Sequence, residues 1–115
     1  RCLLVSENRP EWLIADLAIM LANGITVPAY TTYTEKDYKY LVEDSQPSVI
    51  IVSNDEMHNK LKNIIQEKDF IKKIITFDVI EKADYKNKYS NFNSIIKNSL
   101  NGILFLLNAL IKASF

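Results

Sequence analysis

The sequence predicts an α/β fold, a partial parallel sheet with crossover helices. Short apolar runs at residues 2–5, 48–53 and 71–77 alternate with longer segments that carry helix signals. The run at residues 48–53 is β-branched and almost entirely apolar, as expected for a strand that is covered on both faces. Strands that alternate with helices in this way pair in parallel, through right-handed crossovers.

A helix is predicted directly after the first strand. Pro10 suits its first turn, because the missing N–H is not needed there, and Asn8 is the predicted N-cap. From Trp12 onward this helix is apolar on every side except at Asp16, so we predict that it is buried. Gly24 is the predicted left-handed residue that ends it.

The next segment is predicted as a loop or extended stretch followed by a second helix. Pro28 lies inside residues 25–33 and excludes a central strand there, because proline cannot donate a hydrogen bond to a neighbouring strand. Thr34 and Asp37 form a predicted capping box at the start of the second helix. That helix is expected to end before Pro47.

A third helix is predicted between the strands at residues 48–53 and 71–77. Ser53 and Glu56, three residues apart, give it a second predicted capping box. Its apolar residues recur at the three- and four-residue spacing of one helix face, and they are Met57, Leu61, Ile64 and Ile65. This face should pack against the sheet.

The signal weakens in the last third of the chain. Residues 81–94 are polar and are predicted as a surface loop with a short helical turn, and residues 93–98 as a short helix. Residues 100–115 form a hydrophobic tail. Its longest apolar run, residues 103–107, is far shorter than the roughly 20 residues that span a bilayer.

Composition narrows the function classes. The 115 residues suffice for one domain, and 48% apolar with 24% charged residues is ordinary for a globular protein. Fourteen basic residues balance fourteen acidic ones, so there is no electrostatic case for a nucleic-acid partner. Cys2, the lone cysteine, excludes an internal disulfide and is expected to be an inert core thiol. Two glycines leave few places for a phosphate-cradling loop.

Two polar residues near the first strand could carry chemistry. Arg9 lies where open α/β sheets place ligands, so it could contact an anion, but we favour a turn in which its polar groups pair locally. Asp16 interrupts the apolar helix, and a buried carboxylate is costly without a partner. We expect it to meet Arg9, a threonine of residues 31–34 or the surface, in a structural role.

The remaining candidates also favour structural roles. His58 is predicted on the exposed side of its helix, without a second ligand at metal spacing. Tyr30 and Tyr33 are expected to pack under their loop, and Glu7 and Glu11 to be solvent-facing or helix-start charges. The sequence therefore offers no residue as catalytic, cofactor-binding or metal-binding.

Several ordered blocks resemble a known family. They are Ser6-Glu7-Asn8-Arg9-Pro10-Glu11-Trp12, Ile14-Ala15-Asp16-Leu17-Ala18, Gly24, Val27-Pro28, Tyr30-Thr31-Thr32 and Tyr40-Leu41-x-x-Asp44-Ser45. At this spacing they resemble the N-terminal part of the AMP-dependent synthetases, the acyl-adenylate-forming superfamily. The similarity is greatest to long-chain fatty-acid–CoA ligases and runs from about Leu3 to about Asp78. The fold expected from it is the start of the large N-terminal domain of these enzymes.

The resemblance implies a fragment of such a ligase, with a partial AMP-binding domain at residues 1–99 and an unmatched hydrophobic tail at residues 100–115. Such ligases activate a fatty acid with ATP as the acyl-adenylate and then form a thioester with CoA. ATP, Mg²⁺, CoA and a fatty acid are therefore implied for the full-length enzyme. This sequence lacks the family's phosphate loop, its Tyr-Gly-x-Thr-Glu block, its ribose-binding Asp segment and its catalytic-lysine domain. The chain alone is expected to be inactive and to bind none of these cofactors.

Two other hypotheses stay open. The first is a non-catalytic α/β interaction module derived from the same fold, in which the hydrophobic tail closes the core or makes a homodimer. The second is a flavodoxin-like ligand domain, which would need a cofactor-shaped loop after Val5 or Ser53, and neither position shows one. Localisation is expected to be cytoplasmic, and handling of fatty acids leaves peripheral membrane contact open.

Overall fold

The computed structural model describes residues 1–81, 83–85 and 87–97. Strands and helices alternate along these residues, as the sequence predicts. The elements are β1 (Cys2–Val5), α1 (Pro10–Leu21), β2 (Thr26–Ala29), α2 (Glu35–Ser45), β3 (Val49–Val52), α3 (Asp55–Glu67), β4 (Lys73–Thr76), β5 (Tyr89–Asn91) and α4 (Phe92–Lys97). The predicted strands at residues 48–53 and 71–77 are therefore confirmed.

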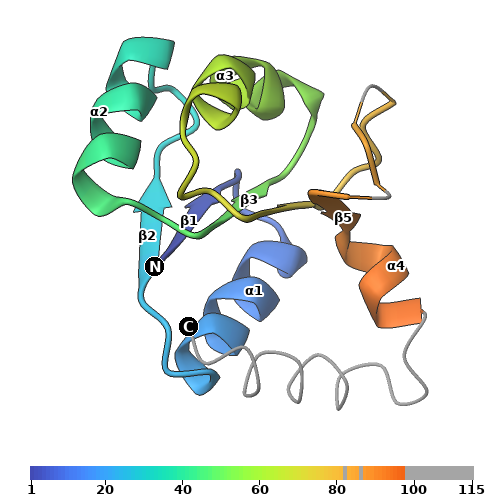
Figure 1. Ribbon diagram of the computed structural model, residues 1–115. Helices are drawn as coiled ribbons and strands as arrows, with labels where there is room; N and C mark the ends of the chain where they lie inside the picture. The colour runs from blue at the N-terminus through green and yellow to red at the C-terminus, as the bar shows by residue number, and fades with distance from the viewer. Residues whose placement is uncertain (82, 86, 98–115) are drawn as a thin grey trace.

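All five strands of the described sheet run parallel, in the order β2-β1-β3-β4-β5. Figure 1 shows α2 and α3 over one face of the sheet and α1 and α4 below the other. β2 lies at an edge, which is where a strand that contains Pro28 can be tolerated. The predicted α/β class with crossover helices is confirmed.

The core has two layers because successive side chains of a strand point to opposite faces. Leu3 and Val5 of β1 belong to the cluster under α2 and α3, together with Leu61. Cys2 and Leu4 belong to the cluster under α1 and α4. Both faces of β1 are fully buried, which explains why this strand is apolar throughout.

Two helix starts were predicted as capping boxes, and one is confirmed. In α2 the Thr34 hydroxyl accepts from the Asp37 amide, and the Asp37 carboxylate accepts from the Thr34 amide. In α3 the N-cap is Asn54 rather than Ser53, and the side-chain oxygen Oδ1 of Asn54 accepts from the backbone amide of Met57 at 3.0 Å. The prediction that Ser53 caps α3 was wrong by one residue, because the Ser53 hydroxyl donates to the Glu7 carboxylate instead.

The predicted N-cap of α1 also shifts by one residue. Its N-cap position is Arg9, without a side-chain cap, so Asn8 does not cap it, although Pro10 lies in the first turn as predicted. At its other end Asn23 is left-handed, with φ of 61°, a conformation that asparagine tolerates better than most residues. The amide of the next residue, Gly24, donates to the carbonyl of Ile19 and closes the helix.

The prediction that α1 is buried was wrong for its outer face. Its buried residues are two alanines and one isoleucine, namely Ala15, Ala18 and Ile19, and Trp12 packs against the same cluster while partly buried. Its large aliphatic side chains point outward and are 41–66% exposed, and they are Leu13, Ile14, Leu17, Met20 and Leu21. Small residues toward the sheet let α1 lie close to it, so the bulky apolar residues end on the surface.

The polar region after β4 also differs from its prediction. β5 pairs with β4 inside residues 81–94, which were predicted as a surface loop. Tyr89 and Ser90 give no apolar run, so period-based reasoning misses such an edge strand. The short helix predicted at residues 93–98 is confirmed as α4, and the Asn91 side chain accepts from the Ser94 amide at its start.

Across the part of the chain that the structure describes, no helix is long and apolar enough to span a bilayer. The longest, α3, has 13 residues and a strongly amphipathic sequence. The predicted hydrophobic tail at residues 100–115 lies outside the described residues.

Candidate functional site

The site predicted by topology is the carboxyl edge of the sheet beside β1. From β1 the chain passes first to β2 and then across to β3 on the other side, so the direction of winding reverses at β1. Open α/β sheets bind ligands at such a switch point, outside the carboxyl ends of the strands. Here the edge is formed by Glu7 and Arg9 after β1, Ser53 after β3 and Asp78 after β4.

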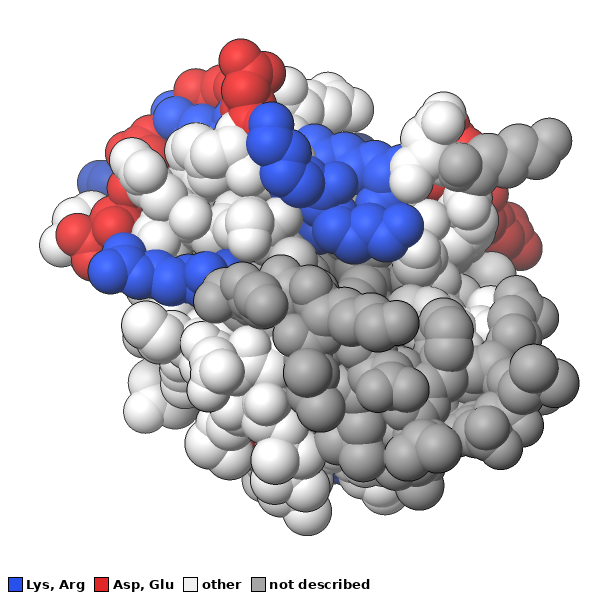
Figure 2. All heavy atoms as spheres, turned by 60° about the horizontal axis from the view of Figure 1, so that its bottom comes forward, with Lys and Arg blue, Asp and Glu red and all other residues white. Residues whose placement is uncertain are grey.

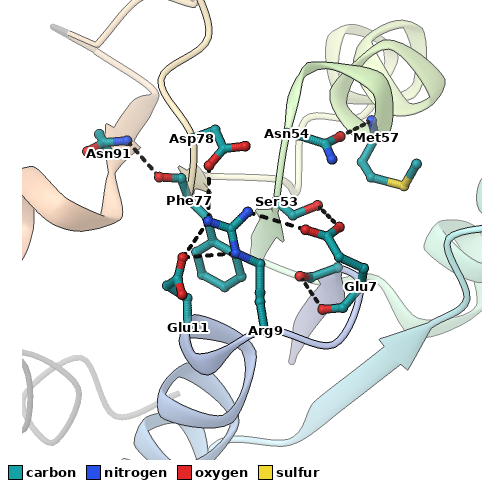
Figure 3. A network of polar contacts seen from close by, with 10 residues as sticks. Glu7, Arg9, Glu11, Ser53, Asn54, Met57, Phe77, Asp78 and Asn91 are labelled. Atoms are coloured by element: carbon teal, nitrogen blue, oxygen red, sulfur yellow. Dashed lines mark hydrogen bonds and ion pairs between the residues drawn. The ribbon is translucent and has the colours of Figure 1, made fainter.

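Arg9 lies at the centre of this edge. Its guanidinium bonds the carboxylates of Glu7 at 3.3 Å and Asp78 at 3.0 Å, and Glu11 through both Nε and Nη2. Its Cζ stands 5.4 Å from the centroid of the Phe77 ring. Figure 3 shows these side chains converging from the β1–α1 turn, the first turn of α1 and the end of β4. We call Glu7, Arg9, Glu11 and Asp78 the arginine clasp.

The electrostatics of the arginine clasp oppose anion binding. Three carboxylates against one guanidinium leave two negative charges at the edge. The hydrogen bonds to Asp78 and then to Glu11 raise the pKa of Arg9 further, so it stays a cation whose donors are already engaged. The predicted local pairing of Arg9 is confirmed, but Glu7 and Glu11 are not merely solvent-facing or helix-start charges, since both bind Arg9.

Ser53 ties β3 to the arginine clasp. Its buried hydroxyl donates to Glu7 Oε2 at 2.8 Å across the β1–β3 switch point. Burial would raise the pKa of Glu7, but hydrogen bonds from its own backbone amide, from Ser53 and from Arg9 lower it overall. The ionised Glu7 is therefore the form that the fold stabilises.

Ser53→Ala should lower the free energy of unfolding by about 1 kcal/mol at neutral pH, because one charge-assisted hydrogen bond is lost while Arg9 still binds Glu7. Urea unfolding of both chains measures the difference. Thr32→Ala, at an exposed loop position, is the matched control and should change nothing measurable. Equal losses in the two variants would contradict the assigned role of Ser53.

A hollow of about 560 Å³ opens next to this edge, between the ends of β1 and β2. Glu7, Asn8, Trp12, Tyr30 and Thr31 line it. Tyr30 is 72% exposed, so its predicted packing under the loop was wrong, because its ring stands out over this hollow.

Tyr33, the second aromatic of the same loop, is placed as predicted. Its ring contacts those of Tyr30 and Tyr38 edge to face, at centroid distances of 5.4 and 5.7 Å. Tyr38 is fully buried, and its hydroxyl donates to the carbonyl of Tyr30. The loop between β2 and α2 is thus anchored by Tyr33 and Tyr38.

The residues that line this hollow do not fit a nucleoside triphosphate with its magnesium ion. The lining of the hollow offers the carboxylate of Glu7 and no Lys or Arg to a phosphate. The carboxylates of the arginine clasp surround a guanidinium, and no group of three His, Cys, Asp or Glu side chains within the described ranges could hold a metal ion. No reaction step is therefore assigned to this edge.

His58 is buried rather than exposed, with 7% of its surface accessible. Its Nε2 shares a 2.7 Å hydrogen bond with the Tyr89 hydroxyl, and the two rings meet edge to face at 5.3 Å. The prediction was wrong because it lacked β5, which places Tyr89 against α3. Burial lowers the pKa of His58, with Lys62 acting in the same direction and Asp55 opposing.

His58 should make stability fall at mildly acid pH. Its pKa is lower in the folded chain than the ordinary 6.5, so its contribution is present above that value and is lost as the pH falls below it. Thermal unfolding between pH 7.5 and 5 should show a falling Tm for the parent chain. His58→Gln should flatten this dependence, whereas an unchanged slope would show that other groups carry it.

Asp16 and Cys2 were both predicted to have structural roles. Asp16 is partly exposed on α1, so of its expected environments it meets the surface. Arg9, another expected partner of Asp16, binds the three carboxylates of the arginine clasp instead. Cys2 is fully buried in the sheet, and burial raises the pKa of its thiol to about 12. An inert core thiol, as predicted, follows from that burial.

A family match and individual relatives all point to one group of enzymes. The AMP-binding enzyme family matches residues 1–101. The long-chain-fatty-acid–CoA ligase ACSBG2 of Rattus norvegicus is 30% identical over 88 residues, which are 76% of this chain and 13% of that protein. ACSBG2 of Gallus gallus is 31% identical over 88 residues, and long-chain-fatty-acid–CoA ligase 6 of Homo sapiens is 30% identical over 80 residues, each match covering 12% of the relative. The chain thus spans a small part of the relatives that it matches.

Proposed function

Because the chain belongs to the AMP-binding enzyme family, we propose that it forms part of a long-chain fatty-acid–CoA ligase and supplies scaffold rather than chemistry. In the whole ligase the fatty-acid carboxylate would attack the α-phosphate of ATP and release pyrophosphate. The CoA thiol would then displace AMP to give the thioester. ATP, Mg²⁺ and CoA belong to that whole enzyme, and this chain by itself binds none of them.

The observation that carries the proposal is the family match across residues 1–101. The relatives at about 30% identity over 80–88 residues are named long-chain-fatty-acid–CoA ligases, which supports a long-chain fatty acid as the substrate class. The division into a partial AMP-binding domain at residues 1–99 and a separate tail at residues 100–115 is part of the same proposal. So is a cytoplasmic location.

The scaffold role is supported by the chemistry of the carboxyl edge. Adenylate formation needs positive charge or free amides where negative charge develops on the α-phosphate. The edge instead presents the arginine clasp, in which the one cation is already held by three carboxylates. These contacts fix the β1–α1 turn to the end of β4, which is a structural task.

The test compares two polypeptides, namely the 115-residue chain and the longest product that its transcript encodes in the same frame. Each is mixed with ATP, Mg²⁺ and palmitate, and incorporation of labelled pyrophosphate into ATP is measured, followed by thioester formation with CoA. The longer product should exchange pyrophosphate and the short chain should show none. Exchange by the short chain would overturn the scaffold role, and absence of a longer active product would overturn the ligase assignment.

The alternative is a free-standing interaction module without catalysis, and the exposed apolar face of α1 is the observation that favours it. A module of that kind should form a defined oligomer, such as a homodimer. Sedimentation of the 115-residue chain distinguishes the two, because a single soluble dimer supports the module. Progressive aggregation supports a piece of a larger fold.

A further inference from the structure

The loop between β2 and α2 is held by side chains from two helices. The Tyr38 hydroxyl of α2 donates to the carbonyl of Tyr30. Nζ of Lys60 on α3 donates to the carbonyl of the next residue, Thr31, at 2.8 Å. Figure 1 shows this loop running from the carboxyl end of β2 to the start of α2. Two consecutive peptide groups of the loop are thus fixed from outside it.

The contact of Lys60 differs from that of an ordinary surface lysine, whose ammonium points into water or toward a carboxylate. Figure 2 shows Lys and Arg side chains spread over one face of the molecule, with Asp and Glu beside several of them. Lys60 is partly buried, and none of the ion pairs between described residues includes it. Its ammonium is directed instead at a main-chain carbonyl 29 positions away in sequence. A charge-assisted hydrogen bond of this kind is stronger than a neutral one and holds its acceptor in place.

The two carbonyls belong to residues that line the hollow beside β1. One part of the lining comes from the segment after β1, with Glu7 and Trp12, and the other from the end of β2 and the loop. We call Tyr30 and Thr31, the loop residues of this lining, the loop wall. Lys60 is not a lining residue, so it acts on the hollow only through the loop wall. The shape of the hollow therefore depends on contacts that are made outside it.

The lining of the hollow restricts the chemistry of its occupant. It offers aromatic surface from Trp12 and Tyr30, together with the side-chain amide of Asn8 and the hydroxyl of Thr31. Its charged side chain is that of Glu7, which would repel a phosphate. An uncharged, flexible chain fits this combination. Two substrates of the proposed ligase reaction contain one, namely the fatty acid in its acyl chain and CoA in the arm that carries its thiol.

We infer that Lys60 is a positioning residue, which holds the loop wall in the conformation that receives an uncharged substrate chain in the hollow. The inference rests on the proposed function, because the substrates are those of the whole ligase. Without its ammonium the loop wall stays attached to the helices through Tyr38 alone, and the Thr31 peptide is free to rotate. Lys60 touches no reacting atom in this role. Its loss should therefore weaken substrate binding and leave the chemical step unchanged.

Hydrogen exchange of the Tyr33 amide, followed by NMR on the 115-residue chain, tests whether Lys60 holds the loop. This amide donates to the Tyr30 carbonyl at 3.3 Å, so its exchange reports opening of the turn. In Lys60→Met it should exchange about tenfold faster, while the Tyr38 amide inside α2 keeps its rate. Lys62→Met, at an exposed position of the same helix, is the matched control and should change neither amide. Unchanged exchange of Tyr33 in Lys60→Met would overturn the inference.

Steady-state kinetics of the longer in-frame product test the effect on the substrate. Lys60→Met should raise the KM for palmitate or for CoA about tenfold, with kcat and the KM for ATP unchanged. The substrate whose KM rises is the one whose chain occupies the hollow. Lys60→Arg keeps a cationic donor and should restore most of the affinity, and Lys62→Met should behave as the parent.

Three results would count against the inference. Parent KM values for both palmitate and CoA in an active Lys60→Met variant would overturn it and leave the ligase assignment intact. A fall in kcat with all three KM values unchanged would overturn it as well, because the role would then not be one in substrate binding. A longer product without pyrophosphate exchange would refute the proposed function, and the substrate role of Lys60 with it.

Discussion

Leu61→Ala should lower the free energy of unfolding of the chain by about 3 kcal/mol, the largest effect expected from any single aliphatic truncation in α3. Leu61 is fully buried in the cluster that α2 and α3 form with β1, β3 and β4. Its loss removes both the transfer free energy of the side chain and the packing around it, since neighbouring strands cannot close the cavity. Urea unfolding followed by circular dichroism measures the change.

Leu13→Ala is the matched control for that prediction. The residue type and the helical setting are the same, but Leu13 is 66% exposed on α1. Alanine is the better helix former, so the free energy of unfolding of the 115-residue chain should change by less than about 0.5 kcal/mol. Comparable losses in both variants would mean that the outer side of α1 is packed in the isolated chain, contrary to the described structure.

Arg9→Gln should cost about 2 kcal/mol, because it leaves three carboxylates facing one another at the carboxyl edge without their common cation. The side chains of Arg9 and Glu11 are 22% and 23% exposed, so water screens their pair less than the contacts with Glu7 and Asp78, whose side chains are about half exposed. Arg9→Lys should recover part of the loss, since an ammonium keeps the charge but cannot reproduce the forked contact with Glu11. Thermal or urea unfolding at neutral pH measures both variants.

Lys39→Gln is the control for Arg9→Gln. Lys39 pairs with Glu67 at 3.7 Å with both side chains about half exposed, and such pairs contribute at most a few tenths of a kcal/mol.

The loss of unfolding free energy in Arg9→Gln should also become smaller in acid. The pKa of Glu7 is lowered in the fold, so its stabilising effect exists above the ordinary carboxyl value of 4.5 and disappears as the pH falls below it. A deficit that persists at pH 2 would contradict an electrostatic origin.

The helix starts show how far local sequence reasoning reaches. The Thr34–Asp37 capping box lies as predicted, because both partners are three residues apart and need nothing from the rest of the fold. Ser53 fits the same local pattern, yet Asn54 caps α3. The choice between two adjacent capping residues depended on Glu7, which lies 46 positions away in sequence and accepts the Ser53 hydroxyl.

In the candidate site, too, the contacts between neighbours in sequence could be predicted and the long-range contacts could not. The β1–α1 turn could be singled out from its position after the first strand, and local pairing of Arg9 could be favoured from its neighbours. The contact between Arg9 and Asp78 could not be predicted, because it joins positions 69 residues apart and exists only once β4 has paired with β3. His58 was misplaced for a similar reason, since Tyr89 reaches it from a strand that has no apolar pattern.

The sequence by itself determined the alternation of strands and helices, the parallel sheet and the family resemblance, because hydrophobic periodicity, capping residues and ordered blocks are local. The tertiary structure alone decided which face of α1 is covered, which carboxylate accepts the Ser53 hydroxyl and that Asp78 binds Arg9. These outcomes depend on contacts between residues distant in sequence. An apolar residue indicates that burial is favourable, but only the packed chain shows where the covering atoms are.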